Sequence, residues 1–138
     1  MDRYVIDTNC LISSFSRQSP FFDIWRRFFA GEFQICVSTE IMFEYEEILT
    51  RKHGNQIARN ILNALQNSQN LMKVDNYYHF NLITQDQDDN KFVDCAIACN
   101  ARLIVTNDSH FNVLHQIEFP KVDVATLEEF YRLLQGIS

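Results

Sequence analysis

The stretch KFVDCAIACNARLIVTND, residues 91–108, decides the fold of this chain. Residues 92–101 carry one charge in ten positions, which predicts a helix from about Lys91 to Asn100 that is buried nearly all round. Residues 102–106 are apolar and β-branched at their centre, which predicts the clearest strand in the sequence. The stretch ends in Asp108, a carboxylate placed just beyond that strand.

The same alternation of helix and strand runs through the remaining sequence. Further strands are predicted at 4–6, 33–37 and 122–125, and residues 71–74 fit either a short strand or a loop. Helices are predicted at about 10–29 with an interruption near Ser19-Pro20, from Ser38 or Thr39 to about 52, at about 55–67, and briefly after Asp108. Residues 84–90 form an acidic loop, and Thr126 and Glu129 have capping-box spacing for a closing helix. We therefore expect one α/β domain over residues 1–138 with a mainly parallel sheet.

Composition excludes several classes of protein. With 46% hydrophobic residues among 138, the chain can bury a core and is not a disordered protein. A formal net charge of −6 excludes a globally basic nucleic-acid binder but leaves room for a locally basic groove. No apolar stretch reaches the length needed to cross a membrane, and Asp7 interrupts the N-terminal segment too early for a signal peptide. We expect a cytoplasmic protein whose four cysteines are reduced and packed in the core.

Two aspartates stand at predicted strand ends. Asp7 directly follows the first strand, and Asp108 follows the strand 102–106. In a parallel sheet the ligand crevice lies beyond the carboxyl ends of the strands, so the two carboxylates would meet at one edge if their strands are neighbours. The alternative for each is an ordinary helix N-cap.

Two further carboxylates are predicted to point inward from helices. Glu44 falls within the apolar stripe of its helix, whereas the glutamates at 46 and 47 fall outside it. Asp94 is the single charge of the buried helix quoted above. An inward carboxylate needs a partner because burial of an unpaired charge is costly. The alternatives are a rim position or an Arg salt bridge for Glu44 and the helix dipole for Asp94, while Asp88 and Asp89 fit capping or solvation.

Four carboxylates at one edge would repel one another, and a hard divalent cation removes that repulsion. Mg²⁺ and Mn²⁺ prefer oxygen ligands, and one or two such ions would offset the charge of Asp7, Glu44, Asp94 and Asp108. A bound ion of this kind activates water for hydrolysis of phosphodiester bonds. The four histidines show no close metal-ligand spacing, and we interpret them as surface or loop residues.

Four segments in this order resemble the PIN domain family. They are VIDTN at 5–9, VSTEIMFEY at 37–45, DDNKFVDCAIA at 88–98 and LIVTND at 103–108, and together they span most of the chain. The nearest likeness is to small single-domain PIN proteins that are described as toxins of toxin–antitoxin pairs. The resemblance implies a three-layer α/β/α sandwich and a metal-dependent ribonuclease. It also implies an antitoxin protein partner, whose gene would be expected next to that of the toxin.

The resemblance also assigns roles to residues. Asp7, Asp94 and Asp108 would bind the metal directly, and Glu44 would hold a metal-bound water or a second ion. Asp89 is a fifth candidate ligand. Asn9 and Thr106 match positions that support the site through hydrogen bonds.

The sequence is least informative about how RNA would be held. Candidate cations are Arg17, Arg26, Arg27, Arg51, Lys52 and Lys91, with ordinary solvated helix charge as the alternative. The aromatic residues at 21–22, 25 and 28–29 repeat at helical spacing. This spacing favours a core or a subunit interface over base stacking, and packing across a two-fold axis would give a homodimer.

Two other functions remain open on the sequence. A phosphoacceptor α/β domain also places aspartates and Mg²⁺ at strand ends, but it needs a Lys at a strand end, and no predicted strand ends in Lys. A binding or scaffold protein could keep this fold without activity. The presence of all four carboxylates favours the nuclease.

Overall fold

A five-stranded, all-parallel sheet forms the centre of the molecule. The structure is a computed structural model, and it describes residues 1–75 and 78–136. Its strand order is β3-β2-β1-β4-β5. The strands are β1 (Arg3–Ile6), β2 (Gln34–Val37), β3 (Leu71–Lys73), β4 (Leu103–Val105) and β5 (Val124–Ala125). β1 and β4 are neighbours, with Ile6 paired to Val105, so the segments that follow them leave the sheet side by side.

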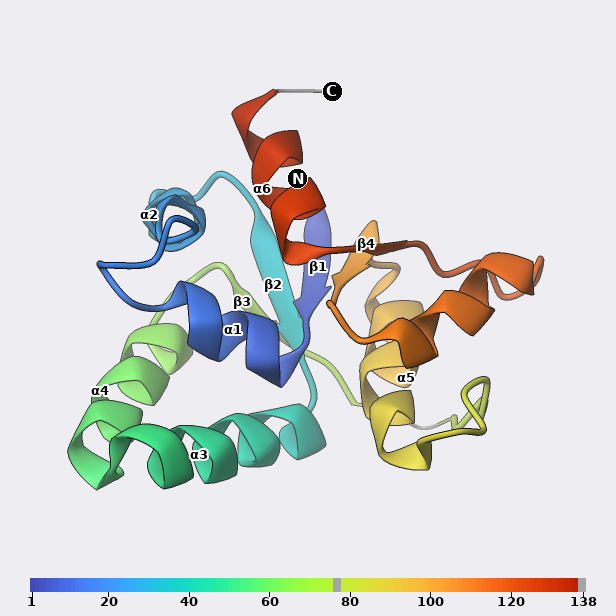
Figure 1. The fold of residues 1–138 in the computed structure, drawn as a ribbon, viewed down its shortest axis with the longest axis horizontal. Coiled ribbons are helices and arrows are strands. Elements are labelled where there is room, and N and C mark those ends of the chain that lie inside the picture. The colour runs from blue at the N-terminus through green and yellow to red at the C-terminus, as the bar shows by residue number, and fades with distance from the viewer. Residues whose placement is uncertain (76–77, 137–138) are drawn as a thin grey trace.

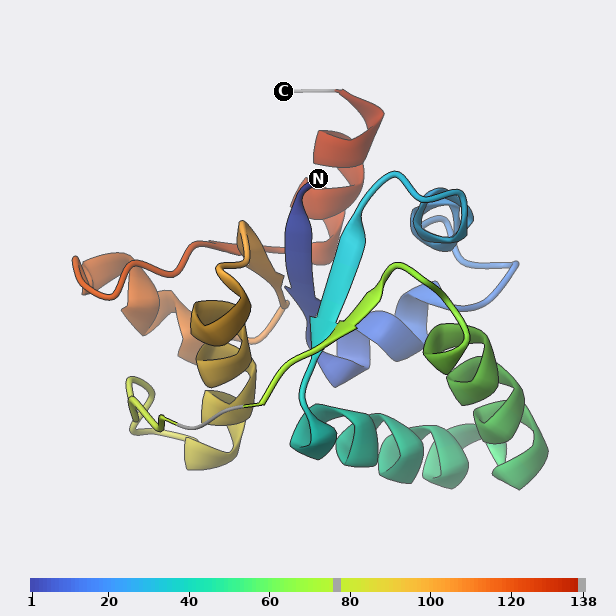
Figure 2. The same cartoon turned by 180° about the vertical axis from the view of Figure 1, so that it is seen from behind.

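Helices cover both faces of the sheet, as expected for a three-layer α/β/α sandwich (Figures 1 and 2). Helix α5 (Asn90–Cys99) packs on one face against β1, β2 and β4. Helices α1 (Thr8–Ser14) and α6 (Leu127–Gln135) lie on the other face. Helix α2 (Asp23–Phe29) joins α1 through a 2.9 Å hydrogen bond from Trp25 Nε1 to Ser14 Oγ.

The alternation of side chains along β1 explains this layering. Successive residues of a strand point to opposite faces, and the Tyr4 ring packs 4.7 Å from the Phe130 ring of α6. Val5 therefore points toward α5, where it is fully buried. Helix α3 (Thr39–His53) lies beyond the carboxyl ends of the strands, with α4 (Asn55–Gln66) packed against it.

Several predicted elements differ in extent from the observed ones. The interruption expected near Ser19-Pro20 is confirmed, but it is longer than predicted, because residues 16–22 form turns and α2 begins only at Asp23. The acidic loop contains a 3₁₀ turn, η1 (Gln87–Asp89), and the helix after Asp108 is also 3₁₀, η2 (Ser109–Gln116). Residues 71–73 do form a strand, and the last strand is only two residues long. The capping box of Thr126 and Glu129 is confirmed.

The interior holds the cysteines and the large aromatic residues. All four cysteines are free and buried, as predicted. Trp25 and Phe28 are fully buried, which confirms the core interpretation for the centre of the aromatic run, while Phe29 is 44% exposed. No helix in the described ranges has the length and apolar character needed to cross a membrane.

Candidate functional site

Asp7 and Asp108 are bridged by a buried threonine at the carboxyl edge of the sheet. Thr106 Oγ1 donates a 2.7 Å hydrogen bond to Asp7 Oδ2 and accepts a 3.0 Å bond from the backbone N–H of Asp108. The arrangement follows from the β1–β4 register, in which the Asp7 N–H donates to the carbonyl of Val105 at 2.9 Å. The sequence prediction that the two aspartates meet at one edge is therefore confirmed.

The two aspartates differ in their relation to the helices that follow them. The Asp108 side chain accepts a 2.9 Å hydrogen bond from the backbone N–H of His110, so it does cap η2, as the alternative interpretation proposed. The Asp7 side chain makes no capping hydrogen bond to α1, although the backbone N–H of Asn9 is near enough to lower its pKa. Asp7 is thus left with a carboxylate that faces the other acidic residues and is only 9% exposed.

Burial and the charges of neighbouring carboxylates both act on Asp7. Burial raises the pKa of Asp7, the Thr106 hydrogen bond opposes that rise, and the charges of Glu44 and Asp108 reinforce it. The backbone N–H of Asn9 also lowers the pKa of Asp7 by hydrogen bonding, whereas the Asn9 side chain is exposed. The hydrogen-bonding role that the sequence assigns to the Asn9 side chain stays a prediction.

Glu44 points inward from α3, as its position in the apolar stripe predicts. Its side chain is 20% exposed, while Glu46 and Glu47 are exposed. One carboxylate oxygen accepts a hydrogen bond from the buried hydroxyl of Thr8, and the other lies 2.6 Å from Lys91 Nζ. The salt bridge that we considered for Glu44 exists, but its cation is a lysine rather than an arginine.

The structure corrects the role expected for Lys91. Its ammonium lies inside the acidic site, with 10% of the side chain exposed, and it also contacts Asp88 Oδ1 at 3.0 Å. Burial lowers the pKa of Lys91, but hydrogen bonds and ion pairs with Glu44 and Asp88 outweigh burial and raise it overall. Lys91 is therefore a charged internal partner of the carboxylates and not a free contact for RNA.

Asp94 is buried in α5 and held by the segment that precedes the acidic loop. Its side chain is 3% exposed. Oδ1 accepts a 3.1 Å hydrogen bond from the backbone N–H of Phe80, and Oδ2 lies 3.3 Å from His79 Nδ1. In the described part of the chain, no hydrogen bond or ion pair joins Asp94 to Asp7, Glu44 or Asp108, so its role as a metal ligand stays a prediction.

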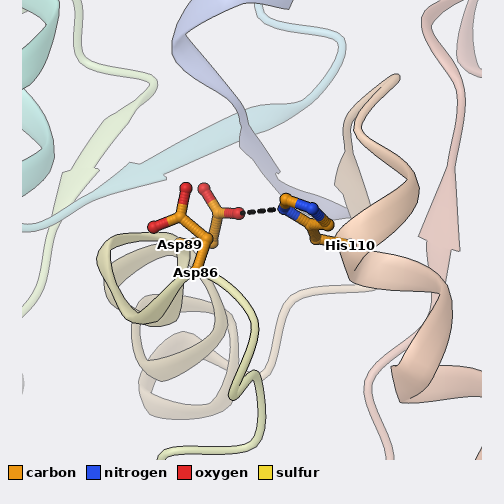
Figure 3. A group of neighbouring side chains, drawn as sticks. All are labelled: Asp86, Asp89 and His110. Carbon is orange, nitrogen blue, oxygen red and sulfur yellow. Dashed lines mark ion pairs between the residues drawn. The ribbon is translucent and has the colours of Figure 1, made fainter.

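A third group lies between η1 and η2 (Figure 3). One ligand atom from each of Asp86, Asp89 and His110 lies within 4.8 Å of the others. His110 Nδ1 is 3.7 Å from Asp89 Oδ2 and 3.5 Å from Asp108 Oδ1, so this group adjoins Asp108. Burial raises the pKa of Asp89 to about 7, and the charges of Asp86, Asp108 and Asp7 add to the rise.

Sequence reasoning missed three residues of this region, His79, Asp86 and His110, and gave Lys91 a different role. His79 is exposed, as predicted for a surface or loop residue, whereas His110 is half-buried, and their contacts with Asp94 and Asp89 were not anticipated. These contacts join elements far apart in the sequence, so residue spacing carries no signal for them. Asp86 had a local signal, because it precedes η1 and caps it through the N–H of Asp88.

Most cations expected to hold RNA are paired with carboxylates. Arg26 and Arg27 bind Asp23, and Arg51 binds Glu47. Arg17 and Lys52 are exposed and stay candidates. One strand does end in a lysine, Lys73 of β3, contrary to the prediction, but β2 separates it from β1, so it does not supply the cation that a phosphoacceptor site needs.

The donor atoms at this edge of the sheet suit a hard divalent cation. Carboxylate oxygens predominate, and His110 adds one nitrogen. Asp89 Oδ2 and His110 Nδ1 are buried atoms without a hydrogen-bond partner among the described residues, which is the state expected of ligand atoms that are completed by a bound ion. The residues present therefore fit Mg²⁺ or Mn²⁺, and such a site can bind a phosphodiester and activate water.

Comparisons with known proteins agree with this fold. One similar chain is from the crystal structure of VapBC2 from Rickettsia felis, which was solved bound to a DNA fragment from the VapBC2 promoter. It has 17% sequence identity and a TM-score of 0.62, and the match covers 90% of this chain and 98% of that one. DNA-bound VapBC from Salmonella typhimurium matches with 15% identity, a TM-score of 0.61 and coverage of 92% and 99%. A comparison with curated proteins gave no match. The sequence profile of the PIN domain matches residues 3–110, and the chain therefore belongs to the PIN domain family.

Proposed function

We propose that this protein is an endoribonuclease that depends on Mg²⁺ or Mn²⁺ and hydrolyses RNA phosphodiester bonds. The observation that carries the proposal is the Asp7–Thr106–Asp108 bridge at the sheet edge, with Glu44 close enough to raise the pKa of Asp7. A carboxylate cluster of this kind is costly for the fold unless a cation offsets it. A metal-dependent nuclease site binds such a cation, which accounts for the presence of the cluster.

Each carboxylate has a separate role in the proposal. Asp7, Asp94 and Asp108 would hold one ion, with Asp89 as an additional ligand on the side of His110. When bound, such an ion lowers the pKa of a coordinated water and offsets charge on the leaving oxygen. Glu44 would accept a hydrogen bond from the attacking water and so orient it. Thr106 fixes the orientation of Asp7.

An RNA-cleavage assay with variants tests this function. Asp7→Asn and Asp108→Asn should each lower the Mn²⁺-dependent cleavage rate by about 100-fold or more, because each removes one charged ligand. EDTA should abolish cleavage by the unmodified protein. Glu46→Gln is the matched control for Glu44→Gln, since Glu46 is an exposed neighbour on α3, and only Glu44→Gln should slow the reaction.

A substrate with a 2′-deoxy sugar at the cleaved position separates hydrolysis from other routes. Attack by water does not use the 2′-hydroxyl, so cleavage of this substrate should persist and leave no cyclic phosphate. Cleavage that needs the 2′-hydroxyl would contradict the proposed chemistry. A protein that binds RNA without cutting it under any metal condition would instead be a binding or scaffold protein with the same fold.

We further propose that the protein is a cytoplasmic toxin restrained by an antitoxin protein. The support is that both solved structures above are VapBC assemblies bound to DNA. Expression of the chain alone should arrest bacterial growth, and coexpression of the neighbouring gene product should relieve the arrest. Asp7→Asn should make the chain harmless. We also expect a homodimer, for which sedimentation analysis is the direct measurement.

A further inference from the structure

Lys91 supplies a positive charge inside the acidic site, where its ammonium contacts Glu44 and Asp88. We propose that the Lys91 ammonium replaces a second ion at Glu44, so that the site binds one divalent cation. This inference rests on the proposed function, because it concerns the metal content of the same site. It makes Lys91 a positioning residue for Glu44 rather than a contact for substrate.

The geometry leaves little room for a metal ion on Glu44. Lys91 Nζ is 2.6 Å from Glu44 Oε1, and the Thr8 hydroxyl occupies Oε2, so both carboxylate oxygens already have donors. The ammonium is well shielded, since 10% of the Lys91 side chain is exposed. A second ion would have to displace a charged hydrogen bond that is stronger than a neutral one.

The contact also depends on the packing of two helices. Lys91 is the second residue of α5, Glu44 lies in α3, and these helices contact each other. Asp88 contacts the same ammonium at 3.0 Å from the exposed side. The ammonium is therefore held by two carboxylates. A lysine on the surface differs, because fixing its flexible side chain in one position costs conformational entropy.

The charge beside Glu44 is partly offset without a second ion. Glu44 and Asp88 both contact the Lys91 ammonium, and these two carboxylates and one ammonium leave one net negative charge in place of the two that they would carry without the lysine. The carboxylates of Asp7, Asp89 and Asp108, whose charges act on one another, are among the ligands left for the one proposed ion.

The test is the number of Mn²⁺ ions bound by the folded protein. Calorimetric titration and Mn²⁺ electron paramagnetic resonance should give one ion for the unmodified chain. Lys91→Met should bind a second ion, with a spectrum showing coupling between two Mn²⁺ centres. Lys91→Arg, which keeps the charge, should still bind one. Lys52→Met is the matched control because Lys52 is exposed on α3, and it should also bind one.

Two results would overturn the inference: two ions in the unmodified protein, or one ion in folded Lys91→Met. If Lys91→Met does not fold, Glu44→Gln decides the question. It should retain one ion with an affinity within about threefold, whereas loss of about tenfold or more would make Glu44 a metal ligand and contradict the proposal. No ion in the unmodified protein would remove the proposed function itself, which is a different result from finding two.

Discussion

At the scale of the residue, ionisation of Asp89 is expected to lower the stability of the metal-free protein. Its pKa is raised from 3.8 to about 7, chiefly by burial and then by the charges of Asp86, Asp108 and Asp7. The unfolded chain loses this proton near pH 4, while the folded chain keeps it to about pH 7. The contribution of Asp89 to stability is therefore fully present below pH 4 and is lost as the pH rises through 7.

Asp89→Asn should remove this pH dependence. In metal-free buffer the variant should be more stable than the unmodified protein by about 2–4 kcal/mol at pH 8, with little difference near pH 4. Denaturant unfolding at both pH values measures the change. Asp123→Asn, at an exposed position, is the control, and its effect on stability should be the same at both pH values. An equal effect of Asp89→Asn at the two pH values would contradict the raised pKa.

Thr106 is the second residue with a definite prediction. Thr106→Val keeps the shape of the side chain but removes the hydroxyl that joins Asp7 to the Asp108 backbone. We expect a loss of about 1–3 kcal/mol in stability, because two buried polar groups lose their partner, and about tenfold weaker Mn²⁺ binding. Thr50→Val, the same change at the far end of α3, should leave Mn²⁺ binding unaltered.

At the scale of the element, the start of α5 is fixed to the segment before the acidic loop by Asn90. Its buried amide accepts a 2.9 Å hydrogen bond from the Ile83 N–H and donates a 2.8 Å bond to the Ile83 carbonyl. Both partners belong to one backbone residue that is itself buried. The loop and η1 between these two anchors carry Asp86 and Asp89, so the clamp determines where those carboxylates lie.

Asn90→Ala should therefore destabilise the protein more than an ordinary surface change. The buried backbone N–H and C=O of Ile83 both lose the Asn90 side chain as their hydrogen-bond partner. This predicts a loss of about 2–4 kcal/mol in the free energy of unfolding. The denaturant midpoint should fall accordingly. Asn63→Ala is the control, because Asn63 is exposed in α4, and its effect should stay within about 0.5 kcal/mol. Equal midpoints for the two variants would mean that the clamp contributes nothing.

At the scale of the whole molecule, the acidic site adds local repulsion to a chain whose net charge is already −6. A bound cation relieves that repulsion only in the folded state, so it should stabilise the fold. Saturating Mn²⁺ at about 100 times its dissociation constant should add about 2.7 kcal/mol, which is roughly 5–10 °C in melting temperature for a domain of this size. Sodium chloride at equal ionic strength is the control, and an equal shift with sodium would exclude a specific site.

The sequence predicts the sheet and its acidic edge because both follow from local patterns. An apolar strand followed by Asp needs only the geometry of a parallel sheet to place Asp7 and Asp108 together. Glu44 and Asp94 follow from helical periodicity. Lys91 and His110 could not be predicted in the same way, because their contacts with Glu44 and Asp89 arise where separate elements pack. Periodicity gives the face on which a side chain lies but not the partner it meets there.

The position of α6 has a practical consequence. The beginning of β1 and the end of α6 both lie at the pole of the molecule opposite α3 and η1 (Figures 1 and 2). An affinity handle or a fluorophore joined next to either element would stand away from the acidic edge. Immobilisation through this pole would present that edge to solution, so a sensor chip prepared in this orientation would report nucleic-acid association without obstruction by its own tether.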